Sequence, residues 1–200
     1  MTRLSELLAE AGLEPVSREQ DAKFSAYLEL LQKWNSKLNL TAIRSPEEIL
    51  RRHFVECIFC ARELPDGIAT LLDFGSGAGF PGIPIALCRP EVQVTLAESQ
   101  AKKAAFLREA VRVLGLSAEV YGGRVEAMTA KFDAVAMRAV DKMAVAVPAA
   151  IGRLKVGGRL VLLVGEAGAV LAGYSALEWE TPLRLPGLER SVMAVGRLRS

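Results

Sequence analysis

Apolar positions in the first sixty residues recur at the spacing of amphipathic helices. One stripe follows the i, i+3, i+4, i+7 pattern and consists of Phe24, Tyr27, Leu28, Leu31 and Trp34. At this spacing Phe24 and Trp34 are expected in the core. A second helix is predicted to open with Ser45-Pro46-Glu-Glu, which supplies an N-cap, a proline at the first helical position and acids in the first turn. It should run to about Arg62, before the break at Pro65-Asp-Gly67.

From Thr70 onward, short β-like runs alternate with helical ones. The expected strands are Thr70–Phe74, Gln93–Ala97, Ala118–Gly122, Phe132–Met137, Arg159–Val164, Glu180–Leu185 and Ser191–Arg197. The expected helices lie near Pro84–Cys88 and at Ala101–Leu114, Asp141–Leu154 (ending at Gly157-Gly158) and Ala167–Leu177. Strands separated by helices predict a parallel sheet buried on both faces.

The last two expected strands flank Pro186-Gly187 and predict an antiparallel hairpin at one edge of the sheet. This α/β order resembles the Rossmann-like methyltransferase fold, a mostly parallel seven-stranded sheet. Residues 1–66 should form a helical extension packed on a core domain of residues 67–200, and the two should make one structural unit.

Composition narrows the class of protein. The longest apolar runs are far shorter than the ~20 residues that span a bilayer. Glu6 and Glu10 interrupt the stretch where a signal peptide would be apolar. We therefore expect a cytoplasmic protein with no membrane association. Of the three cysteines, Cys57 and Cys60 lie in a helix-like run and are expected to be reduced and buried, with no metal site.

The stretch between Leu71 and Gly82 carries the clearest chemical signal. A strand leads directly into three alternating glycines, Gly75, Gly77 and Gly79, which allow a ligand to approach the backbone. Residues 77–82 also satisfy the G-x-G-x-x-G pattern of dinucleotide sites. Asp73, however, would be unfavourable beside a pyrophosphate, whereas it can order the loop or meet the ammonium group of a bound amino acid.

Two further signals follow at the ends of later strands. Glu98 ends the second strand, where a carboxylate accepts hydrogen bonds from ribose hydroxyls in methyltransferases and dehydrogenases alike. Arg124-Val125-Glu126 follows the third strand, where methyltransferases commonly hold the adenine edge. Together with the glycine loop, these residues predict an S-adenosylmethionine site.

The sequence is similar to the glucose-inhibited division protein B family of bacterial methyltransferases, over most of the chain. The matching segments are Trp34-Asn-Ser-Lys-Leu-Asn-Leu-Thr41, Arg52-His53, Asp73 to Pro84, Arg124-Val-Glu126, Arg138-Ala139 and Glu189-Arg190. The resemblance implies methylation of N7 of a guanosine in 16S rRNA within the small ribosomal subunit, with S-adenosylmethionine as cofactor.

The resemblance also implies roles for individual residues. Cofactor contacts are expected from Gly75, Gly77, Phe80, Val125, Glu126 and Arg138, in addition to Asp73, Gly79 and Glu98. A basic rim toward the RNA is expected from Arg124, Arg138 and Arg190, and no side chain is assigned to covalent or acid–base catalysis. The family often carries Lys-Gly after the fifth strand, where this chain has Val164-Gly165.

Guanine N7 has an in-plane lone pair and no proton to remove, so positioning can supply most of the catalysis. His53, the only histidine, is therefore expected to have a structural role or to border the pocket. We expect a monomer that binds no DNA. Three alternatives remain open: a methyltransferase for a small molecule or protein, a nicotinamide-dependent oxidoreductase, and a non-catalytic RNA- or ribosome-binding protein.

Overall fold

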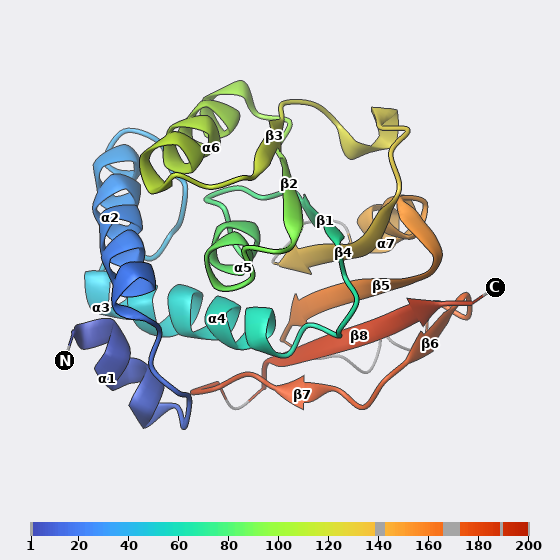
Figure 1. Ribbon diagram of the computed structural model, residues 1–200. Coiled ribbons are helices and arrows are strands. Elements are labelled where there is room, and N and C mark those ends of the chain that lie inside the picture. Colours follow the sequence, from blue (N-terminus) through green and yellow to red (C-terminus); the bar gives the residue numbers. More distant parts are fainter. Residues whose placement is uncertain (1, 139–142, 166–172, 189, 200) are drawn as a thin grey trace.

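A single mixed sheet organises the computed structural model, which describes residues 2–138, 143–165, 173–188 and 190–199 (Figure 1). The strand order is β3-β2-β1-β4-β5-β8-β6, and β7 also pairs with β8. The strands are β1 (Thr70–Phe74), β2 (Gln93–Ala97), β3 (Glu119–Tyr121), β4 (Phe132–Arg138), β5 (Leu154–Val164), β6 (Leu177–Trp179), β7 (Leu183–Arg184) and β8 (Val192–Leu198). The first five strands in this order, β3, β2, β1, β4 and β5, are parallel to one another, and β8 is antiparallel to β5.

Helices cover both faces of the sheet. They are α1 (Arg3–Glu10), α2 (Arg18–Asn35), α3 (Pro46–Ile49), α4 (Val55–Arg62), α5 (Gly82–Cys88), α6 (Ala101–Leu114) and α7 (Met143–Ile151). A π-helical segment, Leu50–Phe54, joins α3 to α4, and a short 3₁₀ helix spans Val125–Ala127. Figure 1 shows α2, α4, α5 and α6 grouped on one side of the sheet and α7 on the other.

Alternating strand residues feed two hydrophobic clusters, as expected for strands that are buried on both faces. Leu71 and Ala134 belong to the larger cluster, which includes the N-terminal helices, whereas Leu72 and Val135 belong to the cluster beneath α7. The apolar stripe of α2 is buried in the larger cluster, where Phe24 is fully buried and Trp34 packs edge-on against Phe106. The N-terminal helices therefore share one continuous core with the sheet.

Most of the predicted elements are confirmed. Three of them, β1, β2 and α6, have the predicted bounds, and β4 is central as expected. The predicted helix from Pro46 to Arg62 is present, with the π-helical segment in its middle. The hairpin around Pro186-Gly187 is also present, since β7 pairs antiparallel with β8.

Two predicted elements near the C-terminus are present with shorter bounds than expected. The helix expected at Asp141–Leu154 ends at Ile151, and β5 begins at Leu154, because this leucine pairs with Phe132 and the strand continues through Gly157-Gly158 past a register shift. The strand expected at Glu180–Leu185 is reduced to Leu183–Arg184. Pro182, which has no N–H to donate, separates it from β6.

A helix was expected at Ala167–Leu177. Its residues 173–176 are not helical, Leu177 begins β6, and residues 167–172 lie outside the described part of the chain. β6 forms because Trp179 packs over Gly196 of β8, where a side-chain Cβ would approach its ring within 2.8 Å. β6 and β7 together occupy one edge position, so the sheet has seven strand positions.

Candidate functional site: a split cleft at the carboxyl ends of the parallel strands

The glycine loop after β1 has a backbone that only glycine adopts readily. The φ angles of Gly75, Gly77 and Gly79 are 72°, 56° and 94°. Gly82, which begins α5, is constrained by space: a Cβ there would lie 2.3 Å from Leu96 Cδ2 and 2.5 Å from Asp73 Oδ2. The loop therefore packs directly against the ends of β1 and β2.

Asp73 orders this loop from beneath. Its Oδ2 accepts a hydrogen bond from the Gly82 N–H at 3.1 Å, and the side chain is fully buried. Its Oδ1 has no hydrogen-bond partner among the described residues. Burial raises the pKa of Asp73 to about 7. Of the two roles expected for Asp73, the structure shows the loop-ordering contact, and Asp73 is not among the residues that line the two cavities described below.

The N-terminal helices hold the same loop from the other side. The Tyr27 hydroxyl of α2 donates to the Ala78 carbonyl at 2.5 Å, and a Cβ on Gly79 would lie 2.9 Å from that hydroxyl oxygen. The Phe80 ring packs on Tyr27, Phe54 and His53, with centroid distances of 5.4, 5.7 and 4.9 Å. The conformation of the loop thus depends on residues before the sheet begins.

Glu98 lies at the centre of the cleft. Its Oε2 accepts from the Gly77 N–H at 3.0 Å and its Oε1 from the Gln100 N–H at 2.7 Å. A cavity of about 290 Å³ lies on one side of Glu98 and a cavity of about 200 Å³ on the other, and both are lined by Gly75 and Glu98. The cleft is therefore elongated, with a carboxylate at its middle.

The expected site residues divide between these two cavities. The larger one is lined by Leu40, Thr41, His53, Gly75, Ser76, Gly77, Ala78, Phe80, Glu98, Lys103 and Arg138. The smaller one is lined by Phe74, Gly75, Ala97, Glu98, Ser99, Gly123, Arg124, Val125 and Glu126. Asp73 and Gly79 line neither cavity and instead shape the loop from below. Arg190 is an exposed residue of the segment before β8.

Arg138, at the end of β4, is held by the helical segment around residue 53. Its Nη2 donates to Glu56 Oε2 at 3.0 Å, to the Arg52 carbonyl at 3.0 Å and to His53 Nδ1 at 2.8 Å. Arg52 and His53 lie in the π-helical segment, an irregularity often found at functional sites. The guanidinium carbon also lies 5.9 Å from the centre of the Phe80 ring, within the range of a cation–π contact.

His53 is neutral in this arrangement. A guanidinium group only donates, so Nδ1 accepts from Arg138 and Nε2 carries the proton, which it donates to Thr41 Oγ1 at 2.9 Å. Burial and the adjacent charge of Arg138 lower the pKa of His53 to about 4. His53 therefore borders the cavity as a hydrogen-bonding support for Arg138.

A third cavity, of about 260 Å³, adjoins the cleft at Arg138. It is lined by Arg52, Glu56, Arg138, Met143, Leu163, Val164, Gly165, Leu185, Leu188 and Ser191. It opens at the carboxyl ends of β4 and β5, and Arg138 lines both this cavity and the 290 Å³ cavity. Arg138 therefore forms the wall between two adjoining spaces.

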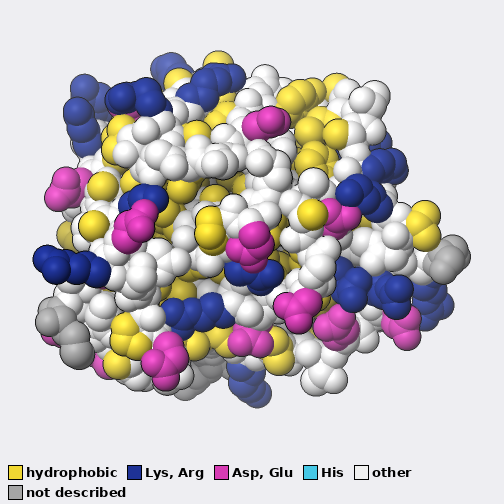
Figure 2. Space-filling view, viewed as in Figure 1, with side chains coloured by type: hydrophobic (Ala, Val, Ile, Leu, Met, Phe, Trp, Pro, Cys, Tyr) yellow, Lys and Arg dark blue, Asp and Glu magenta, His cyan; other side chains and the backbone are white. Residues whose placement is uncertain are grey.

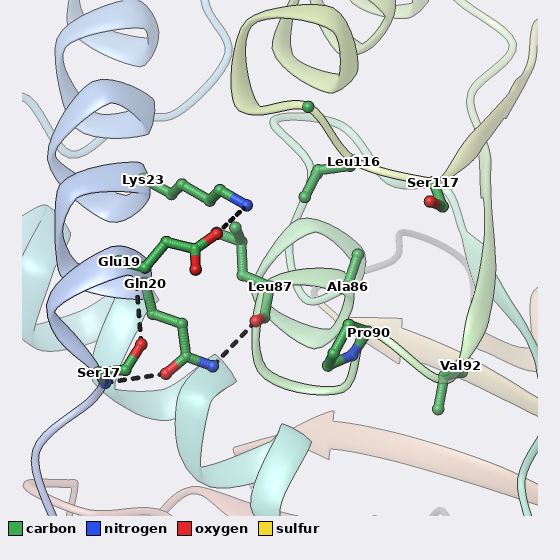
Figure 3. A pocket seen from close by; sticks show the side chains of 11 residues that line it. Ser17, Glu19, Gln20, Lys23, Ala86, Leu87, Pro90, Val92, Leu116 and Ser117 are labelled. Atoms are coloured by element: carbon green, nitrogen blue, oxygen red, sulfur yellow. Dashed lines mark hydrogen bonds and ion pairs between the residues drawn. The ribbon is translucent and has the colours of Figure 1, made fainter.

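A fourth hollow lies apart from the cleft, between α2 and the carboxyl end of α5 (Figure 3). Gln20 and Ser17 form a capping box there, Gln20 Nε2 donates to the Leu87 carbonyl at 3.0 Å, and Lys23 pairs with Glu19. Its described lining residues are shared with none of the three cavities above. Gln20 thus joins α2 to α5, whereas the Lys23–Glu19 ion pair lies within α2 (Figure 3).

The remaining chemistry of the described residues is limited. No group of three or more His, Cys, Asp or Glu side chains that could hold a metal ion occurs among them. Cys57 and Cys60 are free and buried as expected, while Cys88 is only partly buried. No helix of the described chain is long and apolar enough to cross a membrane. On the face of the molecule seen in Figure 2, which is viewed as in Figure 1, basic side chains lie in separate groups with acidic side chains between them.

Several residues that line the cleft were given no role there from the sequence alone. The Trp34–Thr41 segment explains how one of them, Thr41, comes to line it. Asn35 Oδ1 accepts from the N–H groups of Leu40 and Thr41 at 2.9 and 3.0 Å, and its amide donates to the Thr41 carbonyl. The Trp34–Thr41 segment thus forms a turn that presents Thr41 to His53. Glu56 follows the Arg52-His53 pair and Lys103 belongs to a basic pair with Lys102, but the sequence assigned neither residue to the cleft.

Comparisons with known proteins agree with this arrangement. A family model described as GidB, rRNA small subunit methyltransferase G, matches residues 20–170. Ribosomal RNA small subunit methyltransferase G of Xanthomonas euvesicatoria is 41% identical over 192 residues, which cover 90% of this chain and 88% of that protein. The protein of the same name from Chloroflexus aggregans is 36% identical and covers 92% and 84%.

Solved structures match in fold. Cofactor-bound Rv0187 from MTB superposes with a TM-score of 0.64 at 19% identity, covering 90% of both chains. The mitomycin 7-O-methyltransferase MmcR superposes with a TM-score of 0.60 at 16% identity, covering 91% of this chain and 69% of that one. At these identities, the two matches support the Rossmann-like methyltransferase fold.

Proposed function

Because the chain belongs to the rRNA small subunit methyltransferase G family, we propose that it transfers a methyl group from S-adenosylmethionine to a guanosine of small-subunit rRNA. The acceptor atom is N7 of the base, in 16S rRNA. The observation that carries the proposal is the split cleft, in which Glu98 separates two cavities that adjoin the glycine loop.

The shape and donor set of the cleft suit this cofactor. A ribose at Glu98 would place the amino-acid half against Gly75 and Gly77 and the adenine against Val125 and Glu126. A dinucleotide suits the cleft less well. Its pyrophosphate requires free amides at the start of a helix, and Asp73 already accepts from the Gly82 N–H at the start of α5.

Methyl transfer requires little chemistry from the protein. When bound, S-adenosylmethionine supplies an electrophilic methyl group: the N7 lone pair forms the new bond while the carbon–sulfur pair returns to sulfur, leaving S-adenosylhomocysteine and a cationic N7-methylguanine. The protein must align the two reactants in line and exclude water. Phe80 and the Arg138 guanidinium, both held by the N-terminal helices, form the walls that do this.

Phosphate contacts are proposed for the basic residues at the rim. Arg124 lines the smaller cavity, Arg138 lies at the boundary between the cleft and the third cavity, and Arg190 is exposed in the segment before β8. Each Arg→Ala substitution at 124 or 190 should weaken RNA binding and reduce the slope of its salt dependence by about 1. We also propose that the protein acts as a cytoplasmic monomer.

The proposal is tested by supplying radiolabelled S-adenosylmethionine with small ribosomal subunits, free 16S rRNA or a ribosome-free protein fraction as acceptor, each lacking the native methylation. Label is expected in the rRNA of the subunits. Label confined to the protein fraction would support the alternative acceptor class. Equilibrium binding of NAD in preference to S-adenosylmethionine would instead support an oxidoreductase.

A further inference from the structure

The third cavity, between the ends of β4 and β5, has the features of a site for one nucleobase. Its volume of about 260 Å³ equals that of roughly nine liquid waters at about 30 Å³ each, the scale of a single base. It lies at the carboxyl ends of two neighbouring parallel strands, where ligands of α/β sheets bind. Among the described residues, Arg138 is the one that lines both this cavity and the larger half of the cleft.

Two polar groups on the wall of this cavity have unused hydrogen-bonding capacity. Arg138 uses Nε and Nη2 for its hydrogen bonds, and its Nη1 makes none with the described residues. Glu56 uses Oε2 for Arg138, and its Oε1 likewise accepts none from them. The ion pair thus presents an N–H donor beside a carboxylate acceptor.

This donor–acceptor order distinguishes the two purines. Guanine carries the O6 acceptor next to the N1–H and N2–H donors. Adenine carries the N6–H donors next to the N1 acceptor, the reverse order. In guanine, N7 flanks O6 on the side away from N1, so a guanine whose O6 faces Arg138 keeps N7 next to the residue that lines both cavities. Adenine in the same place would oppose donor to donor and acceptor to acceptor.

The remaining walls suit the faces of a flat ring. Leu163, Leu185 and Leu188 line the cavity together with Met143, and Val164 stands where the family often carries lysine. Apolar walls with a few convergent polar groups are typical of pockets that receive an unstacked base. The substitution at Val164 therefore increases the apolar share of this wall.

We propose that this cavity is the acceptor pocket, and that Glu56 selects guanine by accepting from its N1–H and N2–H edge while Arg138 donates to O6. The inference rests on the proposed rRNA methylation and identifies how its base is chosen. Arg138 is expected to touch both reactants, whereas Glu56 touches only the base. This predicts that Glu56 affects acceptor selection and leaves cofactor affinity unchanged.

The experiment compares wild type with Glu56→Gln on subunits reconstituted with guanosine or inosine at the methylated position. Glutamine keeps an oxygen for Arg138 and turns an NH₂ donor toward the base, and inosine keeps N7 and O6 but lacks the N2 amino group. Glu29→Gln, on the exposed face of α2, is the matched control. S-adenosylmethionine affinity and kcat/KM are measured for each combination.

For Glu56→Gln we expect unchanged cofactor affinity, kcat/KM on guanosine lower by at least about tenfold, and a smaller guanosine-to-inosine preference than wild type. An unchanged kcat/KM overturns the inference. So does an equal loss on both bases, because Glu56 would then act only through Arg138. If wild type itself transfers no methyl group to guanosine subunits, the proposed function fails, and this inference fails with it.

Discussion

The stability of an Asp73→Asn variant, measured relative to wild type at the same pH, should increase as the pH rises. The carboxylate is fully buried and its pKa is raised to about 7. An acid whose pKa is higher in the folded state favours folding when protonated. Wild type therefore loses stability as pH rises from the unfolded-state pKa, about 3.8, to the folded-state value of about 7.

The size of the effect follows from the two pKa values. Between pH 5 and pH 8.5 ionisation of Asp73 should lower the free energy of unfolding of wild type by about 3 kcal/mol, at about 1.4 kcal/mol per pKa unit. The asparagine side chain of the Asp73→Asn variant does not titrate and keeps an oxygen for the Gly82 N–H. Its buried NH₂ costs about 1–3 kcal/mol at both pH values and therefore cancels from the comparison.

Urea unfolding of both proteins at pH 5 and pH 8.5 provides the measurement. The difference in unfolding free energy, variant minus wild type, should increase by about 3 kcal/mol between the two pH values. All other titrating groups are common to both proteins and drop out. A difference that stays constant with pH would refute the claim that the buried Asp73 carboxyl is destabilised when it ionises.

Three further predictions concern the cleft. Gly82→Ala should weaken S-adenosylmethionine binding at least about tenfold in calorimetry, because its Cβ would lie 2.5 Å from Asp73 Oδ2 and displace the loop; wild-type affinity would contradict the packing. Glu98→Gln should weaken the same binding by about 10–100-fold, since a charged acceptor for the loop, and for the ribose in the proposed mode of binding, is lost; an unchanged dissociation constant would contradict that mode of binding. The single histidine, His53, should show no NMR titration between pH 5.5 and 8, because its pKa is lowered to about 4; a midpoint near 6.5 would contradict its contact with Arg138.

The sequence predicted the parts of this protein that depend on local pattern. A run of apolar residues followed by alternating glycines indicates a strand and a loop, and β1 has the predicted bounds. The apolar run at Gln93–Ala97 likewise predicts the carboxyl end of β2. Because neighbouring parallel strands end at the same edge of the sheet, this also predicts that Glu98 lies beside the glycine loop, as it does. The boundary between residues 66 and 67 remains a prediction about domain organisation.

Long-range contacts account for what local pattern missed. Glu56 is 82 residues from Arg138 in the chain, and nothing at positions near 56 signals a partner at the end of β4. The sequence indicated Tyr27 as one more core aromatic, yet its hydroxyl donates to the Ala78 carbonyl in the glycine loop. β6 begins at Leu177, the last residue of an expected helix, because pairing with β8 and the contact between Trp179 and Gly196 outweigh local propensity there.

The most direct test of the account is single-turnover transfer of labelled methyl from S-adenosylmethionine to small subunits that lack the native modification, with the product base mapped in the rRNA. We expect one labelled nucleotide, a guanosine methylated at N7, in an amount that approaches one per subunit. Label at another atom or on another base, or no label from protein that binds the cofactor, would contradict it.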